Sequence, residues 1–269
     1  MNETNSGSEQ LTPSSSDGAF VYSGRELEAM DEASNYHRWI LGIFAPYLGR
    51  HLVEVGAGLG SFSELILRHH ACETLSLVEP SREMYQQLEA RARQMPAKPI
   101  VDTYESGFPE AVPLMKAKHS LDSIIYVNVL EHIVDDALEL NAIHDALADH
   151  GRVFIFVPAL SWLYGPFDQR VGHLRRYTKG ELERKLARAG FRTIVSTYFD
   201  LVGIAPWWFK YRLLKSATME PGGVRFYDRY IVPVARRFES LINPPLGKNV
   251  IVIAEKRRRL VRDHNDHIK

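Results

Sequence analysis

Short apolar runs alternate with amphipathic stretches along most of this chain. The apolar runs are 51–55, 74–79, 98–101, 121–127 and 152–157, and the helical patterns between them are 60–70, 81–95, 107–116 and 135–149. Runs that are apolar at almost every position are typical of parallel strands buried on both faces. Strands that alternate with helices predict a doubly wound α/β domain with a mostly parallel sheet.

Further helices and strands are predicted on both sides of this core. A helical pattern covers 36–47, and Ser23 with Glu26 has the spacing of a capping box before it. A second capping box, 178–181, opens a helix that ends at Gly190. Two more strands then follow, at 191–199 and 249–254.

These patterns predict one main domain with additions. Residues 1–19 are polar and are expected to be disordered, and 258–269 form a basic, flexible tail. The domain itself is expected over 20–257. It begins with helices in 20–48 and carries a helical, aromatic insertion at 201–245.

The composition restricts the classes of function. Apolar residues make up 45% of the 269 residues and charged residues 25%, which suits a globular domain with a large core. The chain has 33 basic and 33 acidic residues, so no overall field favours nucleic acid. Cys72 is the only cysteine, and no apolar run reaches the ~20 residues of a membrane span. We therefore expect a cytoplasmic enzyme with a small-molecule substrate, no nucleic-acid partner and no transmembrane segment.

The most informative motif is Leu-Val-Glu-Val-Gly-Ala-Gly-Leu-Gly-Ser, at 52–61. A strand runs into Gly56, Gly58 and Gly60, and an acidic residue, Glu79, ends the next apolar run. Glycines let a backbone approach a ligand, and a carboxylate at this distance can bind ribose hydroxyls. The dinucleotide fingerprint would place its third glycine at position 61, which is serine here. The motif predicts a nucleoside-bearing cofactor other than a dinucleotide.

The same stretch resembles motif I, E/D-x-G-x-G-x-G, of the class I S-adenosylmethionine-dependent methyltransferases. The resemblance covers roughly 34–200 and 248–256, and it implies a Rossmann-like seven-stranded sheet whose last strand is antiparallel. It also implies S-adenosylmethionine as the cofactor. The cofactor residues that it implies are Tyr36, Glu54, Gly56, Ala57, Gly58, Gly60, Glu79, Pro80, Ser81, Met84, Asp102, Thr103, Asn128 and Val129.

Several of these positions carry a specific expectation from the resemblance. Glu79 would accept hydrogen bonds from the ribose, with Ser81 and Met84 beside the adenine. Asp102, expected just after the third strand, would lie near the adenine amino group, with Thr103 as the alternative. For the tyrosine at position 36 two interpretations remain open, closure over the methionine tail or ordinary helix packing.

A second polar cluster, Asn128-Val-Leu-Glu-His132, follows the buried run 121–127. It resembles motif IV of the branch that includes the ubiquinone-pathway methyltransferases, where Asn128 would line the methionine end of the cofactor. Glu131 and His132 would then face the substrate or support it from behind. His132 is either a general base or a structural residue beside the next helix. Some quinone-pathway enzymes associate a Glu-x-x-Glu-His run with a metal, but Asn128 replaces its first glutamate, so no metal is predicted.

A third signal is the loop at 162–178, which is rich in aromatic, acidic, imidazole and guanidinium groups. It resembles the Trp-x-x-Gly…Asp…Gly-His-x-Arg-Arg-Tyr loop that lies over the acceptor pocket in a bacterial group of these enzymes. His173 is then a candidate base that Asp168 would orient, and Arg175 or Arg176 could hold an anionic group. The alternative is that Arg176 and Tyr177 only anchor the loop. The candidates are His173, His132, Asp168 and Tyr177 for catalysis and Trp162, Tyr164, Arg175, Arg176, Trp207 and Trp208 for substrate binding.

The insertion at 201–245 is both aromatic and basic. It would form a helical excursion packed on the core, a self-association surface that makes a homo-oligomer, a lid over an apolar substrate, or an interfacial membrane contact. Three hypotheses for the function remain. The first is O-methylation of a hydrophobic or ring-bearing metabolite, and the second is N- or C-methylation of a lipid-like or isoprenoid acceptor. A non-methylating or non-catalytic protein that binds S-adenosylmethionine is the third.

Overall fold

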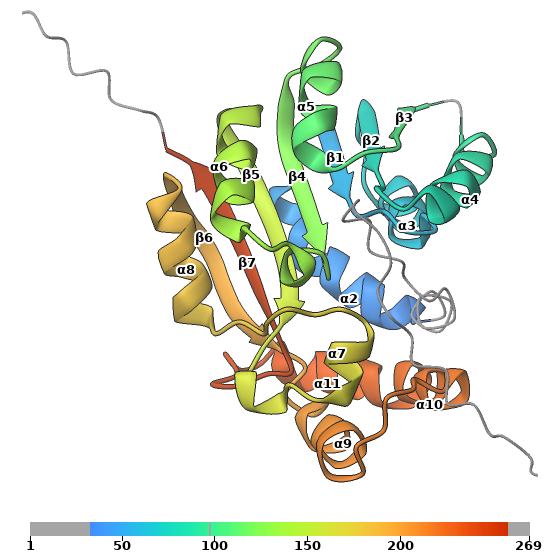
Figure 1. The fold of residues 1–269 in the computed structure, drawn as a ribbon, viewed down its shortest axis with the longest axis vertical. Coiled ribbons are helices and arrows are strands. Elements are labelled where there is room, and N and C mark those ends of the chain that lie inside the picture. The colour runs from blue at the N-terminus through green and yellow to red at the C-terminus, as the bar shows by residue number, and fades with distance from the viewer. Residues whose placement is uncertain (1–32, 97, 258–269) are drawn as a thin grey trace, which may run out of the picture.

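The computed structural model describes residues 33–96 and 98–257. Seven strands form one sheet in the order β3-β2-β1-β4-β5-β7-β6 (Figure 1). Neighbours from β3 to β5 pair in parallel, and β7 is antiparallel to both β5 and β6. The strands are β1 (His51–Val55), β2 (Thr74–Val78), β3 (Ile100–Tyr104), β4 (Leu121–Val127), β5 (Leu147–Pro158), β6 (Phe191–Phe199) and β7 (Asn249–Lys256).

Helices cover both faces of the sheet, as expected for a doubly wound fold (Figure 1). One apolar cluster joins Phe108, Leu140 and Leu182 to the strands, and a second joins Ile40 and Phe62 to the opposite face. The helices are α2 (Ser34–Phe44), α3 (Ser61–His69), α4 (Arg82–Ala92), α5 (Phe108–Lys116), α6 (Asp136–Ala146), α7 (Pro166–Arg170), α8 (Lys179–Arg188), α9 (Ile204–Trp207), α10 (Pro221–Phe226) and α11 (Val232–Glu239). The shorter turns are η1 (Ala45–Tyr47), η2 (Leu130–His132), η3 (Ser161–Leu163) and the π-helical η4 (Trp208–Leu213) and η5 (Tyr227–Ile231).

The central strands are apolar on both faces because both faces are covered. Ile124, Phe154 and Ile251 are fully buried in the middle of the sheet. The predicted fold class is confirmed, including the antiparallel last strand that the resemblance implied. The capping box at 23–26, the N-terminus 1–19 and the tail 258–269 lie outside the described residues.

The third strand is the main error of the sequence prediction for the sheet. It was expected at 98–101, but β3 spans Ile100–Tyr104 and therefore contains Asp102 and Thr103. Both are polar, and the apolar pattern stops before them. β3 lies at the edge of the sheet, where polar side chains reach solvent or a surface partner, so its strand continues through them.

The insertion at 201–245 is helical, as predicted. Its helices α9, α10 and α11 lie beyond the carboxyl ends of the parallel strands (Figure 1). Two buried carboxylates attach it: Glu239 accepts hydrogen bonds from the amides of Asp200 and Leu201, and Asp228 accepts from the amide of Tyr36 at 2.8 Å. In the described part of the chain, no helix is both long and apolar enough to cross a membrane.

Candidate active site

A cavity of about 910 Å³ lies between the carboxyl edge of the sheet and the helical insertion. Its wall begins with the turns that follow β1, β2 and β4 and continues with the loop after β5. The opposite wall comes from α9, η4, α10 and η5. A large, mostly apolar pocket at this edge of an α/β sheet is the usual place for a ligand.

The three glycines of the first turn all have left-handed backbones, but for different reasons. Gly56, Gly58 and Gly60 have φ angles of 67°, 55° and 85°. A Cβ on Gly56 would approach Val129 to 2.5 Å, and one on Gly60 would approach Leu88 to 2.9 Å. A Cβ on Gly58 would meet nothing within 4 Å, because Gly58 faces the cavity. Only Gly56 and Gly58 line the cavity, whereas Gly60 shapes the turn and precedes α3.

Glu79 follows β2 and faces this turn across the cavity. One of its oxygens accepts from the amide of Gly58 at 2.8 Å and the other from the amide of Ser81 at 2.9 Å. Burial raises the pKa of its carboxyl above the usual value, and these two hydrogen bonds act in the opposite direction. Pro80, Ser81 and Met84 line the same part of the wall. The carboxylate is therefore fixed in orientation next to the backbone of the glycine turn.

Glu54, inside β1, is the second carboxyl group of this wall. It is 3% exposed and accepts a hydrogen bond from the hydroxyl of Ser63 at 2.5 Å. Burial raises its pKa to about 8, and the charge of Glu79 also raises it. A cationic group bound nearby would favour the ionised form, so the position suits a ligand with an ammonium group.

Asn128 and Val129 leave β4 and complete the wall beside the glycine turn. Asn128 has a φ of 55°, and its amide donates to the carbonyl of Phe156. Tyr36 also lines the cavity, but its hydroxyl bonds to Asp200 and Asn249. These contacts favour the helix-packing interpretation of Tyr36 over closure on the methionine tail. The structure thus brings together the predicted residues Tyr36, Glu54, Gly56, Ala57, Gly58, Glu79, Pro80, Ser81, Met84, Asn128 and Val129.

The structure does not bring Asp102 and Thr103 to the other predicted cofactor residues, because neither lines the cavity. Asp102 lies in the middle of β3 and forms an ion pair with Lys118 at 2.7 Å. The hydroxyl of Thr103 bonds to that of Tyr85. Residues 106–109, which follow β3, line the cavity instead. A sequence prediction that ended the strand at Tyr104 would have pointed to these residues.

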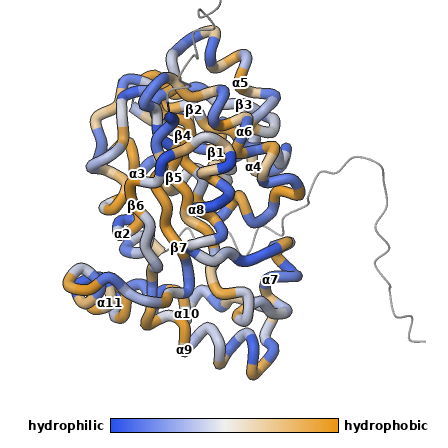
Figure 2. Tube along the Cα trace, turned by 90° about the vertical axis from the view of Figure 1, so that its left-hand side faces the viewer, coloured by the Kyte–Doolittle hydropathy of each residue, from blue (hydrophilic) through white to orange (hydrophobic). Residues whose placement is uncertain are grey.

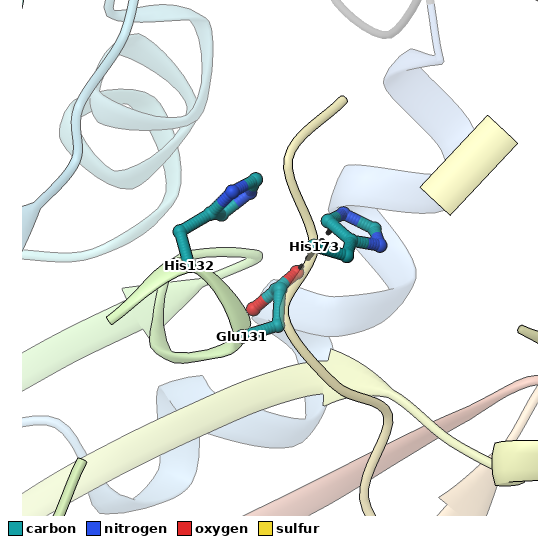
Figure 3. A group of neighbouring side chains, drawn as sticks. All are labelled: Glu131, His132 and His173. Atoms are coloured by element: carbon teal, nitrogen blue, oxygen red, sulfur yellow. Dashed lines mark ion pairs between the residues drawn. The ribbon is translucent and has the colours of Figure 1, made fainter. Parts of the chain in front are cut away.

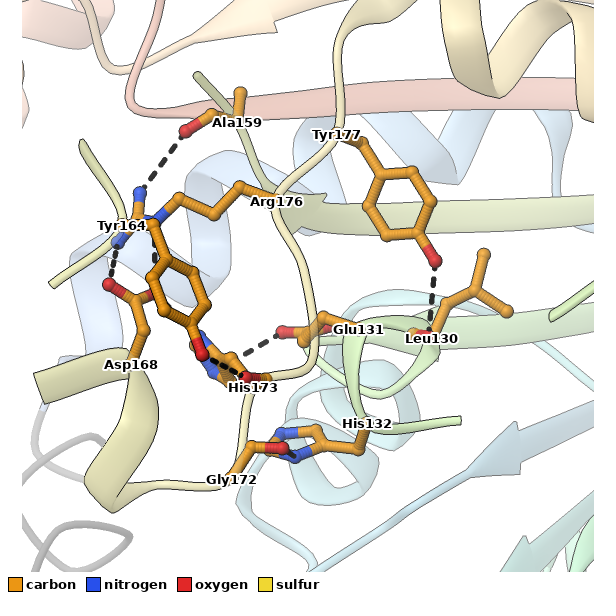
Figure 4. Close-up of polar contacts among 10 residues, drawn as sticks. All are labelled: Leu130, Glu131, His132, Ala159, Tyr164, Asp168, Gly172, His173, Arg176 and Tyr177. Atoms are coloured by element: carbon orange, nitrogen blue, oxygen red, sulfur yellow. Dashed lines mark hydrogen bonds and ion pairs between the residues drawn. The ribbon is translucent and has the colours of Figure 1, made fainter. Parts of the chain in front are cut away.

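The loop after β5 carries a buried ionic network centred on Asp168 (Figure 4). Arg176 donates from Nε to Oδ1 at 2.8 Å and from Nη2 to Oδ2 at 3.1 Å. The amide of Gly165 donates to the same carboxylate, and Nδ1 of His173 lies 2.8 Å from Oδ1. Burial alone would raise the pKa of Asp168, but the hydrogen bond from His173 and the charge of Arg176 lower it. Asp168 therefore stays ionised and fixes the ring of His173, which lines the cavity.

Glu131 and His132 reach this network from η2. Glu131 is fully buried, and its Oε1 lies 3.7 Å from Nε2 of His173. Burial raises its pKa to about 7, while the charges of His173 and Arg176 lower it. His132 also lines the cavity, and burial followed by the charge of His173 lowers its pKa to about 3. A ring with so low a pKa is a poor general base, which favours the structural interpretation of His132.

Glu131, His132 and His173 offer ligand atoms that all lie within 4.8 Å of one another (Figure 3). Figure 3 shows Glu131 and His132 on one turn, with His173 facing them from the loop. The group could hold a metal ion, so the sequence prediction of no metal stays a prediction that chelation would test.

The other candidates from the loop are held by contacts within the protein, and of them only Arg176 lines the cavity. Tyr177 is fully buried, and its hydroxyl bonds to Asp136 at 2.8 Å and to the carbonyl of Leu130. Tyr177 does not line the cavity, and these contacts favour the interpretation that it anchors the loop. Arg175 pairs with Asp136, and the donors of Arg176 are directed to Asp168 and the carbonyl of Ala159 (Figure 4). The contacts of Arg176 favour the interpretation that it anchors the loop, and a role of either arginine in holding an anionic group stays a prediction.

Of the aromatic residues predicted to bind substrate, only Trp207 lines the cavity. Trp207 lines the cavity and packs on Phe167 and Tyr211. Tyr164 does not line the cavity and donates to the carbonyl of His173, which supports the loop. Trp162 and Trp208 are 48% and 43% exposed and do not line the cavity either.

A polar cluster that no sequence pattern indicated closes the cavity near β7. Lys248 forms an ion pair with Asp200 at 2.8 Å, and its Nζ lies over the rings of Tyr36, Trp207 and Tyr227. Tyr227 also donates to Asp200. These residues come from four distant parts of the chain, so periodicity and motif spacing could not bring them together.

Comparisons with known proteins agree with this geometry. A family model described as a methyltransferase domain matches residues 26–196, which is more than half of the chain. The chain belongs to this methyltransferase family. It is an enzyme that uses S-adenosylmethionine, consistent with a cavity wall of glycine backbone and paired carboxyl groups.

Solved structures resemble the methyltransferase in fold. A SAM-dependent methyltransferase from Archaeoglobus fulgidus is 19% identical, with a TM-score of 0.53, and the match covers 84% of this chain and 94% of that one. The 1,6-didemethyltoxoflavin-N1-methyltransferase of Burkholderia thailandensis is 18% identical, with a TM-score of 0.55 and coverage of 87% and 82%. That structure contains 1,6-didemethyltoxoflavin and S-adenosylhomocysteine. No match emerges among curated proteins.

Proposed function

We propose that the methyltransferase transfers a methyl group to a hydroxyl of a small, largely apolar acceptor, with His173 as the base. One observation carries this proposal: a histidine held by a buried, ionised aspartate lies on the wall of the cofactor cavity. Such a pair keeps the proton on Nδ1 and leaves Nε2 able to accept one.

The cofactor fits the wall that the glycine turn and the two carboxyl groups form. S-adenosylmethionine supplies an activated methyl group on its sulfonium. Glu79 would accept from the ribose hydroxyls, and Glu54 would lie near the ammonium of the methionine part. A Cβ on Gly58 would meet no protein atom within 4 Å, so Gly58 would let the cofactor approach the backbone.

The acceptor would occupy the part of the cavity between the loop and the insertion. This part is lined by the rings of Phe167, Trp207 and Tyr211, and by Val171 and Met219. Apolar walls with few polar groups suit a hydrophobic or ring-bearing molecule. A lipid-like acceptor is the second candidate, because the insertion that forms this wall also exposes apolar side chains to solvent.

Proton transfer would follow from the fixed position of His173. As the bond from the methyl group to sulfur would break and leave a thioether, the acceptor oxygen would bond to the methyl group, and Nε2 of His173 would take the hydroxyl proton. Asp168 at Nδ1 and Glu131 near Nε2 would stabilise the imidazolium that forms. The cavity walls would hold donor and acceptor in line and exclude water, so a large part of the rate would come from positioning.

Calorimetry with S-adenosylmethionine and its demethylated product tests the cofactor part. We expect both to bind, and absence of binding at millimolar concentration by folded protein would sink the proposal.

A host extract incubated with enzyme and isotope-labelled methyl donor tests the acceptor part by mass spectrometry. Label in a methoxy group of an apolar metabolite is expected. Label only on nitrogen or carbon would overturn O-methylation while leaving methyl transfer intact.

A further inference from the structure

Exposed apolar side chains are concentrated in the insertion. Most of the large hydrophobic residues that the described part of the chain exposes lie between 202 and 246. Figure 2 shows the segment that carries α9 to α11 as an arm beyond the sheet, with hydrophobic and hydrophilic positions interleaved along it. Single exposed apolar residues are normal on a protein, whereas a contiguous group of them indicates an interaction surface. Their arrangement on the arm therefore has to be considered.

One face of the long helix formed by α10, η5 and α11 packs on the protein. The residues buried along it are Asp228, Val232, Ala235 and Glu239, at spacings of four, three and four. This spacing places them on a single stripe. The stripe contacts α2 and accounts for the attachment of the helix to the domain.

A second stripe runs along the other side of the same helix and faces solvent. We call it the arm stripe; it comprises Phe226, Tyr230, Val234, Phe238 and Leu241, which are between 51% and 80% exposed. Side chains four residues apart lie along one side of a helix. The π-helical turn η5 has more residues per turn than an α-helix, so four residues there come close to one full turn. The rings of Phe226 and Tyr230 lie 5.2 Å apart, which confirms that neighbours on the stripe meet.

The charges next to the arm stripe all have one sign. Arg225, Arg229 and Arg237 are exposed on this helix, whereas the guanidinium of Arg236 lies next to Gly42 of α2. The two acidic residues of the helix, Asp228 and Glu239, are buried and bound to backbone amides, so they do not reach the surface. The guanidinium of Arg229 lies over the ring of Tyr230 at 5.7 Å, directly beside the stripe.

We propose that the arm stripe docks on the surface of a membrane that contains anionic lipids. A helix with aromatic and aliphatic residues on one face and arginines beside them lies in the plane of a bilayer interface, where the rings enter the acyl boundary and the arginines contact phosphates. The turn η4 directly follows α9, which lies at the same end of the molecule as α10 and α11 (Figures 1 and 2). It adds the exposed residues Phe209, Leu213 and Arg212.

A second copy of the chain is a less suitable occupant than a membrane. A two-fold dimer through the arm stripe would place the same patch on both subunits. The exposed Arg229 and Arg237 would then face the same arginines of the other copy, which is unfavourable. Anionic lipid headgroups would instead attract these two arginines.

The membrane surface and the cavity would share one helix. Gly223, Val224 and Tyr227 line the cavity, and Phe226 on the arm stripe lies between them in sequence. An amphipathic acceptor could therefore pass from the bilayer into the cavity along this helix. That consequence rests on the proposed function, whereas docking itself does not.

Vesicle sedimentation tests the docking. The full chain is mixed with phosphatidylcholine vesicles with or without phosphatidylglycerol. We expect binding to the anionic vesicles only, and less binding in about 1 M than in about 0.1 M salt, because salt screens the arginines. Absence of binding to both kinds of vesicle would overturn the proposal.

The variants assign the binding to the arm stripe. Phe226→Ala with Phe238→Ala should lower partitioning about tenfold or more. Leu114→Ala with Leu138→Ala removes comparably exposed apolar side chains from α5 and α6 and should leave it unchanged. Equal binding by both double variants would overturn the proposal.

Light scattering and calorimetry separate the other outcomes. A stable dimer in solution that the Phe226→Ala and Phe238→Ala variant dissociates would mean that a second copy covers the arm stripe, and the proposal would fail. Calorimetry with the demethylated cofactor product confirms that each variant is folded, and it also tests the proposed function separately from docking.

Discussion

Glu54 and Glu79 belong to the same cavity wall but differ in what their oxygens bind. Glu79 accepts from two backbone amides, whereas the partner of Glu54 is a single serine hydroxyl. The backbone amides favour the ionised form of Glu79, which suits a hydrogen-bond acceptor for a ribose. Glu54 holds its proton up to a pH of about 8 in the protein without ligand.

Glu79→Ala should weaken S-adenosylmethionine binding by about 1–3 kcal/mol, because a buried charged acceptor is lost. Calorimetry measures the change. Glu105→Ala removes an exposed carboxylate that does not line the cavity and serves as the control. Unchanged affinity in Glu79→Ala would refute the ribose assignment.

His173→Ala should lower turnover about 10²–10⁴-fold, the usual range for loss of a general base, with little change in cofactor affinity. His132→Ala should have a smaller effect on turnover, since the pKa of His132 is lowered to about 3. The exposed His69→Ala is the control for loss of a histidine. An equal loss of turnover and cofactor binding in His173→Ala would instead show that His173 only supports the loop.

At the scale of elements, the glycine turn combines two functions in one short stretch. Gly58 leaves room for a ligand, and Gly60 leaves room for Leu88 of α4. The sequence predicted all three glycines as cofactor residues because the motif does not distinguish the functions. Only the position of α4 shows which glycine faces protein.

Gly58→Ala should reduce cofactor affinity more than stability, because its Cβ would enter the cavity and meet no protein atom within 4 Å. Its left-handed backbone adds a cost of about 1 kcal/mol. Gly60→Ala should mainly lower the free energy of unfolding, because its Cβ would lie 2.9 Å from Leu88. Denaturant titration and calorimetry on both variants measure the two effects. The opposite ranking of the variants would contradict this division.

The elements also show what sequence patterns can and cannot predict. Apolar runs located β1, β2, β4 and β7, because strands buried on both faces leave a strong hydrophobic signal. The edge strand β3 has a weaker hydrophobic pattern, and the sequence prediction ended it at 101. For that reason Asp102 and Thr103 were expected to follow the strand and lie near the adenine, whereas both lie within β3. In the loop 162–178, the motif identified His173 and Asp168. It could not show that Arg176 and Tyr177 are bound to buried acids, since those contacts depend on η2 and α6.

At the scale of the whole molecule, buried acids make stability depend on pH. The pKa of Glu54 is about 8 in the folded protein and is close to 4.5 when the chain is unfolded. The folded state therefore keeps a proton that the unfolded state releases. The stability associated with this proton is present below about pH 4.5 and is lost as the pH rises towards 8.

Glu54→Gln should reduce the fall in the free energy of unfolding between about pH 5 and pH 8, by at most about 1.4 kcal/mol for each pH unit. Denaturant titrations across this range, without cofactor, measure the slope. Part of the slope should remain, because the pKa values of Glu131 and Glu239 are raised to about 7. The same slope in the variant and the natural protein would contradict the raised pKa of Glu54.

Long-range contacts explain why the cavity wall formed by the insertion was not predictable. The sequence indicated that 201–245 was helical, aromatic and basic, and the structure confirms the helices. It did not indicate that Asp228 would accept from the amide of Tyr36, a partner 192 positions away. Contacts of this kind have no periodic signature.

The position of β7 has a consequence for synthesis of the chain on the ribosome. β7 lies between β5 and β6, although it is made after both. Until residues 249–256 emerge, the edge of β5 has no neighbour on that side and β6 has no strand to join. Asp228, which accepts from the first turn of α2, also emerges late. A nascent chain would therefore expose the edge of β5 while residues 159–248 are made, and a chaperone that shields β edges would act during this interval.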